Sequence, residues 1–395
     1  MQQPSPTESS GVPAQPRRII RGAALFLSLI LCIAAGETVV RVADSLAVGG
    51  NTIALSSDLR VPSISRHHGL KPLTREMREA WGDATVEYCT NSFGMRSATV
   101  KKLPLRNPAA SRILFLGDSF VEGVGVPYDK TMVAQVEKLL NSGTEKSAVE
   151  TLNAGVQSYS PVLEYIALAE YMGKGLAVDA VVLCIDISDP QDALVYNQYL
   201  HEQGVSLRST AEEAEAQFHA RPFVFLYTHS AMFRMAWRFY NPPEKNSGSW
   251  WRDDYYRDRA VWAYDETLIE RWGREGLSRC LNNVGRIAAL CKARQLPLLC
   301  VIYPWPLHLE EGRGPCLFER EIGEYCRKNE LPLLNLYPVF RALPKTDAEA
   351  LYIDGDVHWN SAGHRFVAER IAAKLTVSGI IPAESAAASG KPGMK

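Results

Sequence analysis

Short apolar runs alternate with amphipathic segments from about residue 112 onward. Ile113-Leu114-Phe115-Leu116 is a continuous apolar run that ends at Gly117, as expected for a strand buried on both faces. Between residues 132 and 140 the apolar positions instead recur at helical spacing. Strands that alternate with helices predict a parallel sheet with helices on both faces. Four further strands are expected near residues 149–152, 181–185, 298–303 and 333–336, and a last helix near Ser361.

The alternation is interrupted once, between residues 190 and 278. This stretch predicts a large, mainly helical insertion after the third strand, over the edge where the strands end. Two interpretations of its aromatic residues remain open. The rings form the core of the insertion itself, or they stack on sugar rings. The stretch contains five of the eight tryptophans, namely Trp237, Trp250, Trp251, Trp262 and Trp272.

An apolar segment near the N-terminus, residues 19–42, is long enough to cross a bilayer. Because arginines precede it, we expect residues 1–18 to stay in the cytoplasm and the remainder to be exported. An uncleaved anchor is favoured over a cleaved signal peptide, for which residues 34–36 offer small side chains. Glu37 and Arg41 are four residues apart and are expected to pair on one helix face.

These patterns divide the chain into successive parts. The chain between the anchor and the first buried strand has many turn formers and predicts an irregular or β-rich lead-in. The last residues are small and polar, which is typical of a disordered tail. The expected parts are a tail (1–18), an anchor (19–42), a lead-in (43–111), the α/β domain with its insertion (112–380) and a C-terminal tail (381–395).

Composition and charge exclude several classes of protein. Hydrophobic residues make up 46% and charged residues 22% of the chain, as in an ordinary globular protein with a sizeable core. The formal net charge of -1 gives no electrostatic reason to expect nucleic-acid binding. The eight cysteines include no CxxC pair, and HExxH does not occur. We therefore expect neither a metal site nor a disulfide framework.

Polar side chains follow the expected strand ends. In open α/β sheets, ligands bind beyond the carboxyl ends of the strands, which form one edge. One serine, one Asp-x-His pair and a glycine-containing turn at that edge are the parts of a hydrolytic triad and its oxyanion hole. The segments are Gly117-Asp118-Ser119, Asn153-Ala154-Gly155, Ser188-Asp189, Tyr303-Pro304-Trp305 and Asp356-Val357-His358-Trp359-Asn360.

These segments resemble the conserved blocks of the SGNH (GDSL) hydrolase superfamily. Residues 113–120 resemble block I, residues 153–155 block II and residues 356–360 block V. The Asp-x-His spacing is like that of the alginate O-acetyltransferase-like branch, and residues 91–96 resemble a lead-in of membrane-anchored bacterial members. The match covers roughly residues 112–376 without the insertion. It implies a three-layer α/β/α, flavodoxin-like fold with a parallel five-stranded sheet.

The resemblance also implies roles for individual residues. Ser119 would be the nucleophile and His358 the general base and then the general acid. Asp356 would orient the imidazole, with Asp354 as the fallback. Backbone N–H groups of Ser119 and Gly155 would hold the oxyanion, and no cofactor is implied.

The third block departs from the pattern of the superfamily, which usually has Gly-x-Asn-Asp with the Asn as an oxyanion donor. This chain has Asp186-Ile187-Ser188-Asp189 instead. Ser188 is retained as a shorter candidate donor. Three consequences of this departure remain open: a different substrate geometry, weaker hydrolysis, or no hydrolysis.

Three further residues are candidates for substrate binding, and each has a structural alternative. Asp118 follows the first strand and alternatively caps the next helix. Trp305 and Trp359 lie beside strand ends and alternatively pack in the core. We expect His308 and His364 to be surface or structural residues.

Two functions follow from these observations. The leading one is a membrane-anchored serine esterase or O-acyltransferase that acts through an acyl-Ser119 intermediate. Its expected substrate is an acylated carbohydrate, with O-acetyl groups on a polysaccharide or cell-wall glycan. The expected location is the inner membrane, crossed once, with the domain on the periplasmic side. The alternative is an inactive protein of the same fold that acts in glycan binding or exopolysaccharide assembly.

Overall fold

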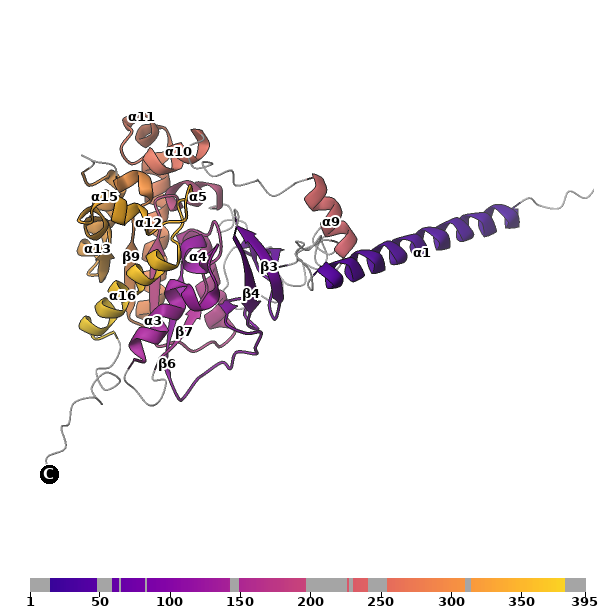
Figure 1. Cartoon of the computed structure of the whole chain (residues 1–395), viewed down its shortest axis with the longest axis horizontal. Coiled ribbons are helices and arrows are strands. Elements are labelled where there is room, and N and C mark those ends of the chain that lie inside the picture. Colours follow the sequence, from indigo (N-terminus) through magenta and orange to yellow (C-terminus); the bar gives the residue numbers. More distant parts are fainter. Residues whose placement is uncertain are drawn as a thin grey trace, which may run out of the picture.

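The computed structural model shows a mixed α/β body from which one long helix, α1 (Gln15–Ala47), projects (Figure 1). It describes residues 15–47, 59–63, 65–81, 84–142, 149–196, 226, 230–240, 254–309 and 314–380. The predicted C-terminal tail and most of the predicted N-terminal tail lie outside these residues, as do Trp250 and Trp251.

Helix α1 contains the apolar segment that the sequence predicted. Residues Ile20–Ala43 have a mean hydropathy of 2.2, and their length and composition suit a membrane crossing. A signal sequence passes the same test. The expected pair is confirmed, since Arg41 donates to the Glu37 carboxylate at 2.8 Å. Glu37 also accepts hydrogen bonds from the first backbone N–H groups of α9 (Ala231–Tyr240), which lies beside this end of α1 (Figure 1).

Five parallel strands form one side of the sheet, as predicted for the α/β domain. Numbered along the chain, they lie in the order 2-1-3-4-5, which is the flavodoxin-like order. The order reverses at the first strand, and the crevice beside such a reversal is where ligands bind in these folds. The strands are β6 (Ser111–Leu116), β7 (Val149–Asn153), β8 (Ala180–Ile185), β9 (Leu298–Ile302) and β10 (Leu333–Asn335).

The lead-in is β-rich, which is one of the two forms predicted for it, and three of its strands extend this sheet in antiparallel pairing, which the sequence did not predict. Arg96 of β5 (Arg96–Ser97) pairs with Asn153 of β7, and β4 (Ala84–Thr90) and β3 (Arg75–Trp81) follow outward. Within the described residues the sheet therefore has eight strands, of which the predicted five are the parallel part. Strands β1 (Arg60–Ser63) and β2 (His67–Leu70) form a separate antiparallel pair.

Helices cover the sheet in two groups. Helices α3 and α16 pack against each other, and α4, α5 and α12 form the other group. The larger helices are α3 (Met132–Leu140), α4 (Pro161–Gly173), α5 (Asp189–Tyr196), α12 (Arg274–Ala293), α13 (Leu317–Lys328) and α16 (Ser361–Val377). The short ones are α2 (Ser119–Glu122), η1 (Tyr128–Lys130), α10 (Asp254–Val261), α11 (Glu266–Leu268), η3 (Ile269–Gly273), η4 (Pro306–Leu309), α14 (Tyr337–Arg341) and α15 (Lys345–Glu349).

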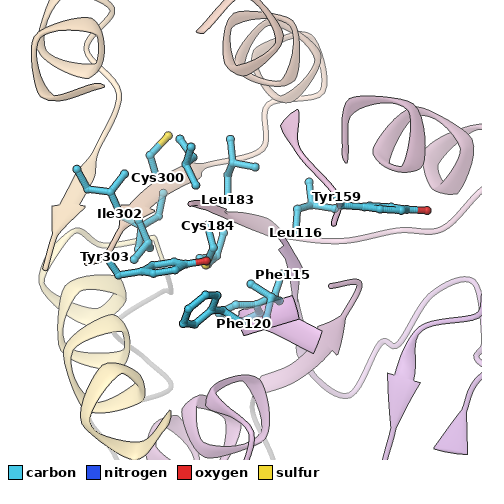
Figure 2. Close-up of a cluster of buried hydrophobic side chains, with 14 of the residues drawn as sticks. Phe115, Leu116, Phe120, Tyr159, Leu183, Cys184, Cys300, Ile302 and Tyr303 are labelled. Carbon is cyan, nitrogen blue, oxygen red and sulfur yellow. The ribbon is translucent and has the colours of Figure 1, made fainter. Parts of the chain in front are cut away.

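The core lies between the helices and the parallel strands. Figure 2 shows buried side chains of β6, β8 and β9 with the rings of Phe120 and Tyr303 near them. The centroids of these two rings are 4.9 Å apart. Cys184 and Cys300 are buried within strands here, and all eight cysteines are free.

The described part of the insertion contributes to this core. Trp262 is fully buried, its indole N–H donates to the Ile187 carbonyl at 2.8 Å, and its ring lies 5.4 Å from that of Trp272. These two rings therefore pack in the core, as the first of the two interpretations of the aromatic residues predicted. The side chain of Trp237 lies outside the described residues.

Candidate active site

Ser119 is the first residue of α2, directly after β6 and the reversal in strand order. The turn before it is tight, since a Cβ at Gly117 would lie 2.3 Å from Val121 Cγ2. Asp118 caps α2, because its Oδ1 accepts a hydrogen bond from the Phe120 N–H at 2.9 Å. The capping alternative for Asp118 is thus confirmed, and the turn presents Ser119 at the edge of the sheet.

A chain of hydrogen bonds joins Ser119, His358 and Asp356. Ser119 Oγ lies 2.7 Å from His358 Nε2, and His358 Nδ1 lies 2.6 Å from Asp356 Oδ1. The three residues are 8%, 5% and 6% exposed, so the chain lies in a largely water-excluded site. An ionised Asp356 only accepts hydrogen bonds, so Nδ1 carries the proton and Nε2 is left to accept the serine proton. This is the tautomer that a general base requires.

Three donors fix the Asp356 carboxylate. Besides the His358 ring, the backbone N–H of His358 donates to Oδ1 at 3.0 Å, and the indole N–H of Trp81 donates to Oδ2 at 2.8 Å. Burial raises the pKa of Asp356, but His358 and these hydrogen bonds outweigh burial and leave it below its usual value. Asp354, the fallback, is exposed. Asp356 is therefore the carboxylate that contacts His358.

Trp81 is a site residue that the sequence analysis missed. It ends β3 in the lead-in, and its ring stands edge-on to that of His358 at 4.8 Å. Its indole packs over Gly125, where a Cβ would lie 3.2 Å from Trp81 Cδ1. No motif or spacing marks Trp81, because it meets Asp356 across 275 positions of sequence.

The lead-in also anchors the helix that carries Ser119. Glu122 of α2 is fully buried and accepts hydrogen bonds from both terminal nitrogens of Arg60, at 3.0 and 2.6 Å. Burial raises the pKa of Glu122, but the Arg60 charge more than offsets this and lowers it. Arg96, also buried, donates to the carbonyls of Glu122 and Val126 just after α2. Two cations of the lead-in thus hold the end of α2 in place.

The candidate oxyanion donors differ in availability. Within the described part of the chain, no acceptor is found for the Ser119 N–H. The Gly155 N–H donates to Asn153 Oδ1 at 3.1 Å, while the Asn153 amide donates to the Val121 carbonyl at 2.8 Å. Gly155 lies hard against α2, since a Cβ would be 2.2 Å from the Glu122 nitrogen. An oxyanion would therefore share the Gly155 donor with Asn153.

Ser188 is bound to its own loop. Its hydroxyl donates to Asp186 Oδ1 at 2.6 Å, and its backbone N–H donates to the same oxygen at 2.7 Å. The one hydroxyl proton of Ser188 is thus directed at Asp186.

The two candidate tryptophans are packing residues in this structure. Trp305 is buried and donates to Asp186 Oδ2 at 2.7 Å. Trp359 is fully buried, with its ring 4.6 Å from that of Tyr303. His308 and His364 are buried and hydrogen-bonded to backbone, which fits the structural role expected for them.

Comparisons with known proteins give likenesses of fold. No protein-family model and no curated protein matches the sequence. Among solved structures, the chain is similar to a putative lipolytic protein of the G-D-S-L family from Desulfitobacterium hafniense, at 11% identity and a TM-score of 0.33, covering 67% of this chain and 99% of that one. It is also similar to TesA, at 11% identity and 0.39 over 69% and 100% of the two chains. An acetyl xylan esterase, AlAXEase, is similar at 14% identity and 0.38, over 68% and 100%.

Proposed function

We propose that this protein cleaves or transfers an acyl ester group through Ser119. The observation that carries the proposal is the hydrogen-bonded chain of Ser119, His358 and Asp356, with the imidazole tautomer fixed by the carboxylate. A serine hydroxyl is a weak nucleophile at neutral pH and needs an adjacent base, which His358 supplies at 2.7 Å.

In the first half of the reaction, Ser119 Oγ attacks the ester carbonyl while its proton passes to His358 Nε2. Asp356 stabilises the imidazolium that forms. The Ser119 N–H, and the Gly155 N–H shared with Asn153, stabilise the negative charge on the carbonyl oxygen. The C–O bond to the leaving alcohol then breaks, His358 returns the proton to that oxygen, and the acyl group remains on Ser119.

In the second half, a hydroxyl compound attacks the acyl-Ser119 ester, with His358 again taking and returning the proton. Water as the acceptor gives an esterase, and a sugar hydroxyl gives an O-acyltransferase. We propose a glycan with O-acetyl groups as the substrate and the periplasmic side of the inner membrane as the location. The apolar segment of α1 and the arginines before it support this location.

A fluorophosphonate probe tests whether Ser119 is activated. The full chain, purified in detergent, is labelled alongside the Ser119→Ala and His358→Ala variants, and the modified peptide is identified by mass spectrometry. We expect labelling at Ser119 and a loss of labelling in both variants. A folded wild-type chain that takes no label contradicts the proposal and favours the inactive, glycan-binding alternative.

A second measurement separates the two acceptors. Unlabelled protein from a preparation that reacts with the probe is supplied with an acetyl ester and with an acetyl-free polysaccharide. Both acetate and acetylated glycan are then quantified. A transferase releases acetate slowly and diverts acetyl groups to the glycan when it is added. Rapid release of acetate without acetylated glycan identifies an esterase.

A further inference from the structure

Four carboxylates gather behind Ser119, at the ends of separate elements. Asp118 follows β6, Asp186 and Asp189 follow β8, and Glu164 lies in the first turn of α4. One carboxylate oxygen from each of the three aspartates lies within 4.8 Å of the other two. Glu164 is a further buried carboxylate in the neighbourhood, and its charge raises the pKa of Asp189.

All four side chains are removed from water, and the Arg259 charge, which is paired with Asp192, lowers the pKa of Asp186 without an ion pair to it. Asp186, Asp189 and Glu164 are fully buried, and Asp118 is nearly so. In the described part of the chain, none of them forms an ion pair with Lys, Arg or His. Burial, with repulsion between neighbouring carboxylates, raises the pKa of Asp118, Glu164 and Asp189 well above the usual range. Such a group requires neutralisation, because uncompensated buried charge is very costly.

Glu164 is an independent sign of a missing ligand. Among the residues that the structure describes, neither of its carboxylate oxygens has a hydrogen-bond partner, and Asp189 Oδ1 also has none. Buried polar atoms are almost always satisfied, so unsatisfied ones in a native protein call for an ion or water. Asp118 and Asp186 are partly satisfied by the Tyr303 hydroxyl and the Trp305 indole, which hold their carboxylates in place.

We propose that Asp118, Asp186 and Asp189 bind one divalent cation beside Glu164, with Ca²⁺ as the fitting ion. The ligand atoms are all oxygens, which suit a hard cation and not Zn²⁺. Oxygens on opposite sides of one Ca²⁺ lie roughly 4.6–5.2 Å apart, because each bond is about 2.3–2.6 Å. The three aspartate oxygens, within 4.8 Å of one another, can therefore reach one ion. Cysteine and histidine spacings did not predict this site because its ligands are carboxylates from two separate segments.

The cation would tie the nucleophile turn to the loop after β8. Asp118 precedes Ser119 directly, and Asp186 binds both the hydroxyl and the backbone N–H of Ser188. A common ion would fix these two loops against each other. Its role would be structural, and the inference does not depend on the proposed reaction.

The experiment measures cation binding by the full chain in detergent. After removal of metals with a chelator, the melting temperature is recorded with and without added Ca²⁺ or Mg²⁺. Metal that stays bound through gel filtration is quantified by mass spectrometry. At a Ca²⁺ concentration about 100 times the dissociation constant, we expect a rise in melting temperature of about 5 °C. We also expect about one Ca²⁺ per chain and a smaller rise with Mg²⁺.

Asp189→Asn distinguishes cation binding from a failure to fold. The variant removes a buried charge, so it should melt no lower than the wild type in chelator, yet lose most of the Ca²⁺-dependent rise. Asp129→Asn, at an exposed carboxylate, should keep the full rise. Absence of bound metal and of any rise in the wild type overturns the inference and assigns the neutralisation to protons. If Ser119 is still labelled by fluorophosphonate, the proposed function stands regardless.

Discussion

The hydrogen bond from Trp81 to Asp356 can be removed with little change in shape by Trp81→Phe. The variant keeps an aromatic ring beside His358 but deletes the indole N–H that lies 2.8 Å from Asp356 Oδ2. A hydrogen bond to a charged group contributes about 1.5–3 kcal/mol. Trp81 is only partly buried, so water can replace part of the lost hydrogen bond. We therefore take the lower end of this energy range. About 1.4 kcal/mol corresponds to a factor of ten in rate.

The expected result is therefore a fall of about tenfold in the second-order rate constant for labelling of Ser119 by a fluorophosphonate. Loss of the donor frees the Asp356 carboxylate to turn, and the His358 imidazole is then less often aligned with Ser119. Trp272→Phe is the matched control, because this ring packs on Trp262 in the insertion. It should be labelled at the wild-type rate.

A double-mutant cycle decides whether Trp81 acts through Asp356. In an Asp356→Asn background the indole has no carboxylate to hold, so Trp81→Phe should have almost no further effect on the labelling rate. A Trp81→Phe variant labelled as fast as the wild type would refute the reasoning. An equal tenfold loss in both backgrounds would also refute it, since that result indicates general damage to the fold.

Three other residues or pairs give predictions from the same structure. Arg60→Met leaves Glu122 buried and unpaired, so it should lower the free energy of unfolding by roughly 3 kcal/mol in urea titrations. Most of this loss should be recovered in the Arg60→Met/Glu122→Gln double variant. An equal loss in the double variant would contradict this account. Burial lowers the pKa of His364 to about 3 from an ordinary 6.5, so the unfolded chain binds the extra proton as the pH falls below 6.5. Stability should drop by about 1.4 kcal/mol per pH unit from this residue, and His364→Gln should reduce the slope between pH 6.5 and 4.5 by that amount. Gly155→Ala places a Cβ 2.2 Å from the Glu122 nitrogen, so α2 must shift and Ser119 labelling should fall by about a hundredfold; a near-normal rate would show that the turn adapts.

The parallel part of the fold could be predicted because its signals are local. Strand β6 is a run of apolar residues between polar ends, and α3 repeats its apolar positions at helical spacing. The contact of Ser119 with His358 also followed from local signals. Ser119 comes just after β6 and His358 just before α16, and both lie at the same edge of the sheet. Predicting the positions of these elements therefore predicted that the two side chains meet.

The lead-in could not be placed, because its strands carry no signal of their partner. The join to the parallel sheet rests on one antiparallel pairing, of Arg96 with Asn153. The short strand β5 has no periodicity to read. Ser188 was kept as a donor because a sequence cannot say where a hydroxyl points, and the nearest acceptor, Asp186, is two residues before it.

The lead-in and the α/β domain therefore depend on each other at the candidate site. A chain that began at residue 112 would lose the Trp81 donor to Asp356 and the Arg60 partner of the buried Glu122. It would also expose the edge of β7 beside Asn153, the residue that holds Gly155. Each loss falls on a group that contacts the triad or the helix carrying Ser119. The segment between α1 and the domain is thus better understood as a wall of the site than as a spacer from the membrane.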